Sequence, residues 1–150
     1  MSEYTWTMQV CRTAEEMAAT RDAVGAMLEG LGNNIIKHLG NVELGRSVRM
    51  FIRNQAGQVV GGIIGNMFGG WVYVELLWVE ESLRNQGLGS QLLRALEEEA
   101  IRMGCQHAHL DTYSFEARPF YEQHGYEVFA VLEDYPAGHR KFFLKKALLP

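Results

Sequence analysis

The sequence has few cysteines, no excess of basic residues and no long hydrophobic run, and each absence excludes a class of protein. Its 150 residues include two cysteines, Cys11 and Cys105, which are too few for a disulfide framework or a thiolate metal cage and suit a reducing compartment. The net charge is −4, whereas a nucleic-acid-binding protein carries a basic patch. We therefore expect no nucleic-acid partner, and the slight negative charge leaves room for a cationic substrate.

Secretion and membrane insertion are not predicted either. Residues 1–10 lack a basic start followed by an apolar run, so they do not form a secretory signal. The longest apolar stretch, around Trp71–Val79, is interrupted by Glu75 and is far shorter than a membrane span. We expect a soluble cytoplasmic protein without a membrane partner.

The composition indicates one globular domain over residues 1–150. The chain is 47% hydrophobic and 21% charged, and a chain of this length buries about 70% of the surface that its unfolded form exposes. No repeat, low-complexity tract or Pro/Ser-rich linker divides it. Two domains would each be too small to fold comfortably.

The N-terminal part predicts a strand followed by two helices. Residues 4–10 alternate apolar and polar side chains, as in a half-buried strand. A capping box at Thr13 and Glu16 begins a helix that Gly30 and Gly32 interrupt, and a short second helix covers residues 33–39.

The remainder alternates strands with single helices. Glycine turns separate three strands, and helical spacing of leucines then begins at Gly87 and ends at Gly104. The acidic residues 97–99 of this helix are expected to point mostly to solvent. In chain order, the later elements are strands 48–53, 58–67 and 71–79, the Gly87 helix, strand 105–112, a helix around 117–124, and strands near 126–131 and 140–146.

The resulting order, β-α-α-β-β-β-α-β-α-β-β, is typical of an α+β domain with a mixed sheet and not of a doubly wound one. Strand 71–79, the Gly87 helix and strand 105–112 form a βαβ unit. These two strands are therefore expected to be parallel, with a right-handed crossover.

The turn Arg84-Asn85-Gln86-Gly87-Leu88-Gly89-Ser90, between a buried strand and an amphipathic helix, is the strongest functional signal. Its glycines allow a tight turn and the close approach of a ligand. The amides of the first helical turn are unpaired and lie at the positive end of the helix dipole, where a diphosphate binds well. The guanidinium of Arg84 adds a permanent cation suited to phosphate.

Other interpretations of this turn are a plain helix start and known nucleotide-binding motifs. A dinucleotide fingerprint requires a third glycine where Leu92 stands, directly after a strand, but seven residues separate Val79 from Gly87. The phosphate-binding lysine motif G-x-x-x-x-G-K-[ST] is absent from the sequence.

Two segments together resemble the GNAT superfamily of N-acetyltransferases. Arg84-x-x-Gly87-x-Gly89, after a strand ending in Leu77-Trp78-Val79, is similar to its acetyl-CoA-binding motif, and residues 117–126 are similar to its A-x-x-(F/L)-Y-x-x-x-G-(F/Y) signature. The resemblance covers essentially the whole chain. It implies a mostly antiparallel mixed sheet of about seven strands, with the fourth and fifth strands parallel, flanked by about four helices.

The resemblance implies acetyl-CoA as co-substrate and assigns the residues that bind it. The pantetheine arm would pair with the backbone of a strand edge, as an added strand does. Ser114 stands where relatives often have an asparagine that contacts this arm; a hydroxyl reaches less far, and a helix-capping role is the alternative. The strand edge is Leu77, Trp78 and Val79, and the pyrophosphate amides are those of Asn85, Gln86, Gly87, Leu88, Gly89 and Ser90.

Two residues are implied as catalytic. Tyr121 matches the family's tyrosine near the cofactor sulfur, and a phenol can protonate the leaving thiolate at neutral pH. Its structural alternative is an aromatic anchor for a short helix. Glu75 matches a catalytic glutamate of several members, and burial among aromatic residues would raise its pKa toward that of a base. The alternative is an ion pair with Arg49 or Arg53 on a neighbouring strand.

The run His107-x-His109-x-Asp111 could begin a metal site, because alternation places all three side chains on one strand face. However, Thr112 stands where metallohydrolases with this motif carry another histidine. We therefore expect no metal and interpret these residues as ordinary polar strand positions. His109 remains a second-choice base.

The sequence thus predicts direct acetyl transfer to a primary amine in a ternary complex, without a cysteine nucleophile. A non-catalytic acyl-CoA-binding module and a metal-dependent hydrolase are the alternatives from other classes. The resemblance places the loop 133–139 near the acceptor, where its acidic residues would favour a cationic amine. A small polyamine, an aminoglycoside-like amine, an amino acid and a protein N-terminus all stay open as acceptors, and edge strands permit a homodimer.

Overall fold

A computed structural model describes residues 5–40 and 45–149, which fall into two compact units on either side of residues 41–44. The N-terminal unit contains helices α1 (Ala14–Ala18) and α2 (Arg21–Leu39). The predicted capping box begins α1: the Thr13 hydroxyl accepts the Glu16 amide at 3.1 Å, and the Glu16 carboxylate accepts the Thr13 amide at 3.0 Å.

The division between the two helices differs from the prediction. The expected interruption at Gly30 and Gly32 is wrong, because α2 runs through both glycines and the chain instead breaks before it, at Ala19 and Thr20. The Thr20 hydroxyl there donates to the carbonyl of Met17 at 2.9 Å. A glycine inside a helix costs only about 1 kcal/mol relative to alanine, which the other residues of a 19-residue helix can offset.

The predicted N-terminal strand over residues 4–10 is also wrong. Tyr4 lies outside the described residues, and residues 5–10 belong to no strand. Alternation indicates which side chains could share a face, but a strand also needs ladder hydrogen bonds to a neighbour. No strand of the described ranges pairs with this segment, so the sheet has six strands where about seven were expected.

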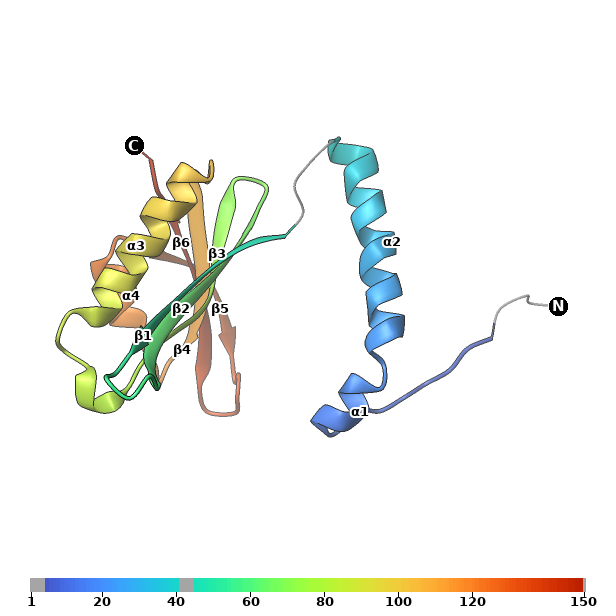
Figure 1. The fold of residues 1–150 in the computed structure, drawn as a ribbon, viewed down its shortest axis with the longest axis horizontal. Coiled ribbons are helices and arrows are strands. Elements are labelled where there is room, and N and C mark those ends of the chain that lie inside the picture. Colours follow the sequence, from blue (N-terminus) through green and yellow to red (C-terminus); the bar gives the residue numbers. More distant parts are fainter. Residues whose placement is uncertain (1–4, 41–44, 150) are drawn as a thin grey trace. The chain divides into compact units, whose positions relative to one another are not determined.

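The second unit is an open mixed sheet with two helices on one face, as the α+β prediction requires (Figure 1). The strand order is β1-β2-β3-β4-β6-β5; β3 and β4 are parallel, as predicted, and the other neighbours are antiparallel. The elements are β1 (Arg46–Arg53), β2 (Val59–Phe68), β3 (Trp71–Val79), the 3₁₀ turn η1 (Glu81–Leu83), α3 (Leu88–Arg102), β4 (His107–Tyr113), α4 (Arg118–Gln123), β5 (Glu127–Glu133) and β6 (Arg140–Ala147).

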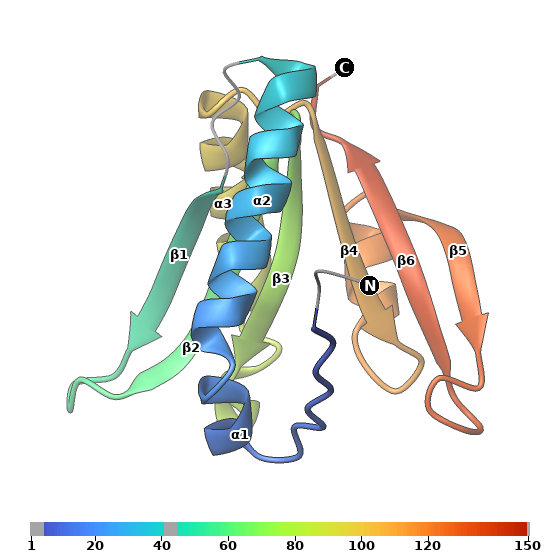
Figure 2. The same cartoon turned by 90° about the vertical axis from the view of Figure 1, so that its right-hand side faces the viewer.

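The parallel contact between β3 and β4 is short. Trp71–Tyr73 pair with His107–His109, and beyond them no pairing joins the two strands within the described residues. Figure 2 shows β3 and β4 close at one end and diverging toward their C-terminal ends. The remainder of β3 pairs with β2 alone, across a bulge in which Glu75 has no partner residue. The C-terminal half of β3 is therefore an open strand edge inside the sheet.

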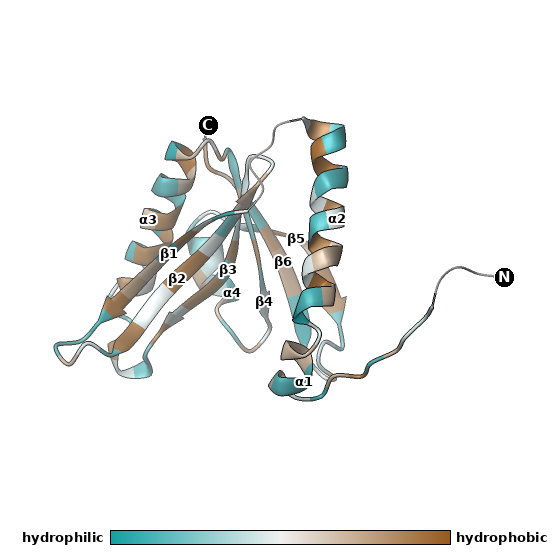
Figure 3. Cartoon of the chain, turned by 45° about the vertical axis from the view of Figure 1, so that its right-hand side comes forward, coloured by the Kyte–Doolittle hydropathy of each residue, from teal (hydrophilic) through white to brown (hydrophobic). Residues whose placement is uncertain are grey.

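Helix α3 forms one side of the core. Its buried residues Leu92, Leu93, Leu96 and Ala100 pack on β1, β2 and β3, and Figure 3 shows largely apolar strands beneath a helix with hydrophilic bands. Gly65 of β2 allows the close approach, because a Cβ atom there would lie 2.6 Å from a Leu96 methyl carbon.

The expectation that residues 97–99 point mostly to solvent is wrong for Glu97, because only 9% of its surface is exposed. Its two carboxylate oxygens accept the Tyr126 hydroxyl at 2.9 Å and the Lys146 ammonium at 2.8 Å. Burial and the Glu97 charge both raise the pKa of Tyr126. Partners from outside the helix thus compensate the buried carboxylate, which helical periodicity alone does not reveal.

We expect Gly65→Ala to destabilise the protein by about 1–3 kcal/mol, the usual cost of overpacking a core. The added methyl group would overlap Leu96 and lie 3.0 Å from Val72. Gly89→Ala is the matched control, since its Cβ would meet Phe120 at an ordinary 3.5 Å. Urea denaturation measures the free energy of unfolding of the wild type and of both variants. A midpoint of Gly65→Ala equal to that of the wild type would contradict this account of the packing.

Candidate active site

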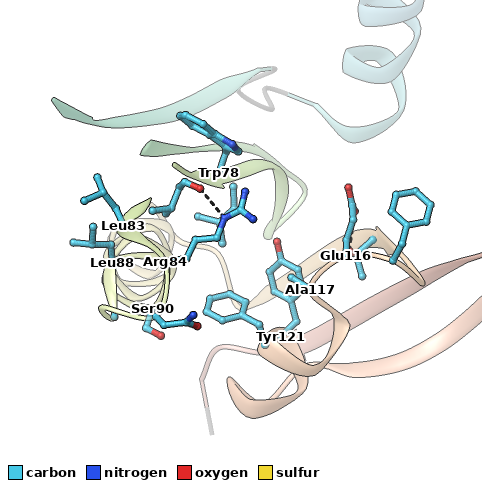
Figure 4. Close-up of a pocket in the computed structure, with 16 residues that line it drawn as sticks. Trp78, Leu83, Arg84, Leu88, Ser90, Glu116, Ala117 and Tyr121 are labelled. Carbon is cyan, nitrogen blue, oxygen red and sulfur yellow. Dashed lines mark hydrogen bonds between the residues drawn. The ribbon is translucent and has the colours of Figure 1, made fainter. Parts of the chain in front are cut away.

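A cavity of about 730 Å³ opens where β3 and β4 diverge, bounded by the end of β3, the start of α3 and the segment leading into α4 (Figure 4). Most of the residues predicted for cofactor binding line it, together with Tyr121. The lining residues are Leu77, Trp78, Val79, Leu83, Arg84, Asn85, Gly87, Leu88, Gly89, Ser90, Thr112, Phe115, Glu116, Ala117, Phe120 and Tyr121.

The start of α3 presents backbone amides without a side-chain cap. Gly87 is the N-cap residue and has a left-handed backbone with φ of 80°, a conformation that favours glycine. Among residues 5–40 and 45–149, no side chain accepts a first-turn amide, and amides in that turn have no partner inside the helix. This arrangement at the positive end of a 15-residue helix suits an anion such as a phosphate.

The side chain of Arg84 is held at the end of β3. Its Nε donates to the carbonyl oxygen of Val79 at 3.0 Å (Figure 4), and its terminal nitrogens have no partner within the described residues. Gln86 differs: its side chain donates to the carbonyl of Ser82 at 3.3 Å, and it does not line the cavity. Arg84 is therefore anchored at one nitrogen and can still bind an anion.

Tyr121 reaches the cavity from α4 and is 8% exposed. Figure 4 shows its hydroxyl pointing into the cavity toward β3, and no described residue forms a hydrogen bond with it. Burial raises the pKa of Tyr121 to about 12, and the charges of Glu116 and Asp111 contribute to this rise. The phenol is accordingly protonated at neutral pH and free to donate.

The expected burial of Glu75 is wrong, because its side chain is exposed and does not line the cavity. The bulge at this position leaves both Glu75 and Leu76 exposed, which interrupts the alternation of β3. The carboxylate accepts a hydrogen bond from the Asn66 side chain at 2.5 Å. Within the described residues it forms no ion pair with Arg49 or Arg53.

Ser114, like Gln86, was predicted to bind the cofactor but does not line the cavity. Its hydroxyl accepts the amide of Arg140 at 3.1 Å and lies 3.4 Å from a ring nitrogen of His139. Its own amide donates to the Arg140 carbonyl at 2.8 Å. These bonds connect the end of β4 to the start of β6.

The histidines of β4 stack on aromatic residues of β3. His107 stacks on Trp71 with ring centroids 4.5 Å apart, and His109 stacks on Tyr73 at 4.9 Å. Asp111 accepts the Tyr73 hydroxyl and pairs with a lysine of β6, each at 2.8 Å. Burial lowers the pKa of His109. No group of three potential ligand side chains that could hold a metal occurs among the described residues.

Sequence reasoning missed several residues of the wall opposite α3, including Phe115 and Glu116. One Glu116 oxygen accepts the Thr112 hydroxyl at 3.0 Å and the Tyr113 amide at 3.2 Å. A carboxylate in the short loop between a strand and the Tyr121 helix was the signal available in the sequence, because functional residues concentrate in such loops.

Comparison with known proteins identifies the family. Residues 12–126 match the model of the Acetyltransferase (GNAT) family. The chain is 38% identical over 101 residues to Acetyltransferase Atu2258 of Agrobacterium fabrum, covering 67% of this chain and 74% of the relative. It is 37% identical over 95 residues to the Blasticidin-S acetyltransferase of Streptomyces morookaense, covering 63% and 70%.

A solved structure of a candidate acetyltransferase from Agrobacterium tumefaciens is 31% identical and has a TM-score of 0.77, with 96% of this chain and 99% of that chain covered. The chain belongs to the GNAT acetyltransferase family. It is therefore an N-acetyltransferase, an enzyme of the class that transfers an acetyl group from acetyl-CoA to an amine. Of the described helices, none is long and apolar enough to cross a membrane.

We expect Gly89→Asp to weaken acetyl-CoA binding by about tenfold or more, because a carboxylate at the α3 terminus would repel a pyrophosphate. Gly89→Ala adds only a methyl group, whose Cβ makes an ordinary contact with Phe120, and separates bulk from charge. Calorimetric titration measures the affinities. If wild type and Gly89→Asp bound acetyl-CoA with equal affinity, the assignment of the pyrophosphate to this turn would be wrong.

Proposed function

We propose that residues 1–150 form a single acetyltransferase domain that transfers acetyl directly from acetyl-CoA to a primary amine in a ternary complex. One observation carries the proposal: a single cavity connects the uncapped amides of α3 with the free hydroxyl of Tyr121. The match of the family model to residues 12–126, which spans both units, supports one domain.

The cofactor would bind along the open edge of β3 and the start of α3. No strand pairs with Leu77, Trp78 and Val79 on the β4 side within the described residues, so an amide-rich pantetheine arm can pair there as an added strand. The pyrophosphate would meet the backbone of residues 85–90, with the anchored Arg84 beside it. Gln86 can contribute its amide even though its side chain turns away. Ser114 is retained as a contact for the arm, although its hydroxyl is engaged with β6.

Bound acetyl-CoA supplies the acetyl group and the thiolate that leaves. A base first removes a proton from the ammonium group of the acceptor. The neutral amine nitrogen then forms a bond to the acetyl carbon while the carbon–sulfur bond breaks, and Tyr121 donates its phenolic proton to the departing sulfur. The new amide nitrogen releases its surplus proton to solvent, and the tyrosinate recovers a proton from solvent. Because the amine attacks the acetyl carbon directly, no covalent enzyme intermediate forms.

Glu75 remains the proposed base. Its carboxylate lies at the bulge, at the point where β3 separates from β4, and is held by Asn66. Because Glu75 does not line the cavity, it would accept the proton through water. His109 is the second choice: its lowered pKa keeps the imidazole neutral, but it also lies outside the cavity lining.

The acceptor is proposed to be a small-molecule amine. The 37% identity to a relative named for blasticidin S supports this class over the amine of a peptide. The sheet ends in edge strands β1 and β5, through which a homodimer can form. Both cysteines are free thiols, which supports a reducing, cytoplasmic location.

Tyr121→Phe tests the proton donor. We expect kcat to fall roughly 10–100-fold, or about 1.4–2.7 kcal/mol of transition-state stabilisation. A thioester with a more acidic leaving thiol should recover part of this loss. In the wild type, loss of the donor proton should set in near pH 12 and not near pH 10. Equal defects with both thioesters would show that the hydroxyl positions the cofactor without donating.

Glu75→Gln should lower kcat about 10²-fold while leaving acetyl-CoA affinity unchanged, because the variant keeps the shape and removes the proton acceptor. The exposed Glu80, just beyond β3, provides the matched control Glu80→Gln. The measurement is the dependence of kcat on pH. A profile identical to that of the wild type would exclude Glu75 as the base.

A further inference from the structure

Three aromatic rings form a row beside the cavity. The rings of Tyr113 and Phe115 are stacked and nearly parallel, with centroids 5.2 Å apart and an interplanar angle of 1°. Tyr113 stacks on its other neighbour, Tyr135, at 6.1 Å and 9°. Tyr113 ends β4, Phe115 follows it, and Tyr135 belongs to the connection between β5 and β6. Two segments of the chain, the end of β4 with the residues just after it and the β5–β6 connection, thus hold three rings nearly parallel.

The row has different neighbours along its length. The ammonium of Lys141 lies beside two of the rings, 5.3 Å from the Tyr135 centroid and 5.5 Å from the Tyr113 centroid. At the end of the row away from Tyr135, Phe115 is 58% exposed and lines the cavity. Its ring contacts in the described residues are Tyr113 and, edge-on, His139 at 5.0 Å. Phe115 therefore offers a flat apolar surface in the cavity that also contains Tyr121.

A carboxylate lies next to this ring. Glu116 lines the same cavity, and its charge reaches Tyr121, whose pKa it helps to raise. Its Oε2 is fixed by the Thr112 hydroxyl and the Tyr113 amide. Its Oε1 accepts no hydrogen bond within the described ranges. The fixed carboxylate thus has one oxygen free to accept an N–H group from a ligand.

We propose that Phe115 and Glu116 form the acceptor site, and that the acceptor is a primary amine carrying a flat aromatic or heteroaromatic ring. The inference rests on the proposed function and names its substrate class. The ring would extend the row by stacking on Phe115, and stacking of this kind adds to the gain from apolar burial. The ammonium would donate to Glu116 Oε1, a charge-assisted bond that also holds the nitrogen near Tyr121.

The test compares two amines with the same two-carbon chain, 2-phenylethylamine, which has a flat aromatic ring, and 2-cyclohexylethylamine, which has a puckered saturated ring. Two quantities are measured for each: kcat/KM by thiol release from acetyl-CoA, and the affinity for the CoA-bound protein by calorimetry, where no transfer can occur. We expect the flat ring to be preferred about three- to tenfold in both, the range that stacking supplies.

Variants assign the preference to residues. Phe115→Leu should reduce it to about twofold or less, whereas Phe115→Trp should retain it because a flat ring remains. Phe129→Leu is the matched control, since Phe129 is similarly exposed at 55% but does not line the cavity. Glu116→Gln should weaken both amines roughly tenfold or more without changing the preference; Glu127→Gln, at an exposed position of β5, should not.

The outcomes separate this inference from the proposed function. Acetylation of both amines without preference, or a preference that survives Phe115→Leu, would overturn the acceptor site and leave acetyl transfer intact. Preferential binding to the CoA complex without thiol release would support the site and contradict transfer. Failure of both amines to bind and to react would overturn the inference as well.

Discussion

β3 and β4 pair over three residues and then separate, and the position of the cavity depends on that short contact. Because β3 continues to Val79 paired with β2 alone among the described strands, its other edge keeps polar backbone groups available to a ligand. The bulge at Glu75 lies where this change occurs. The same separation gives α3 room to begin beside the β3 edge, so strand-edge and helix-terminus groups face one cavity.

The other wall of the cavity depends on packing around α4. Tyr121 contacts the rings of Phe120 and Tyr126 edge-on, with centroids 5.2 and 5.9 Å away. Tyr126 in turn donates to the buried Glu97 of α3. The proposed proton donor is thus positioned by aromatic contacts that a buried carboxylate fixes from the opposite helix. Burial has a chemical consequence too, since it is the main reason that the pKa of Tyr121 rises above its ordinary value.

Local patterns predicted the parts of the fold that local interactions determine. The strand Trp71–Val79, the start of α3 and the glycine turn have the predicted positions, because turn chemistry and helical periodicity act over a few residues. The exposure of Glu75 and the burial of Glu97 were mispredicted, because each depends on a bulge or on partners distant in sequence. The N-terminal strand failed for lack of a pairing partner, and Glu116 was missed because its role arises from the loop that folds it toward Tyr121.

The central claim is that the open edge of β3 and the uncapped start of α3 bind acetyl-CoA together. Amide hydrogen exchange with and without coenzyme A tests it most directly, since the proposed contacts are made by backbone N–H groups. The account predicts slower exchange at residues 77–79 and 85–90, with the edge strand β5 (Glu127–Glu133) unchanged. Protection that omits both segments, or that falls on β5 instead, would contradict the account.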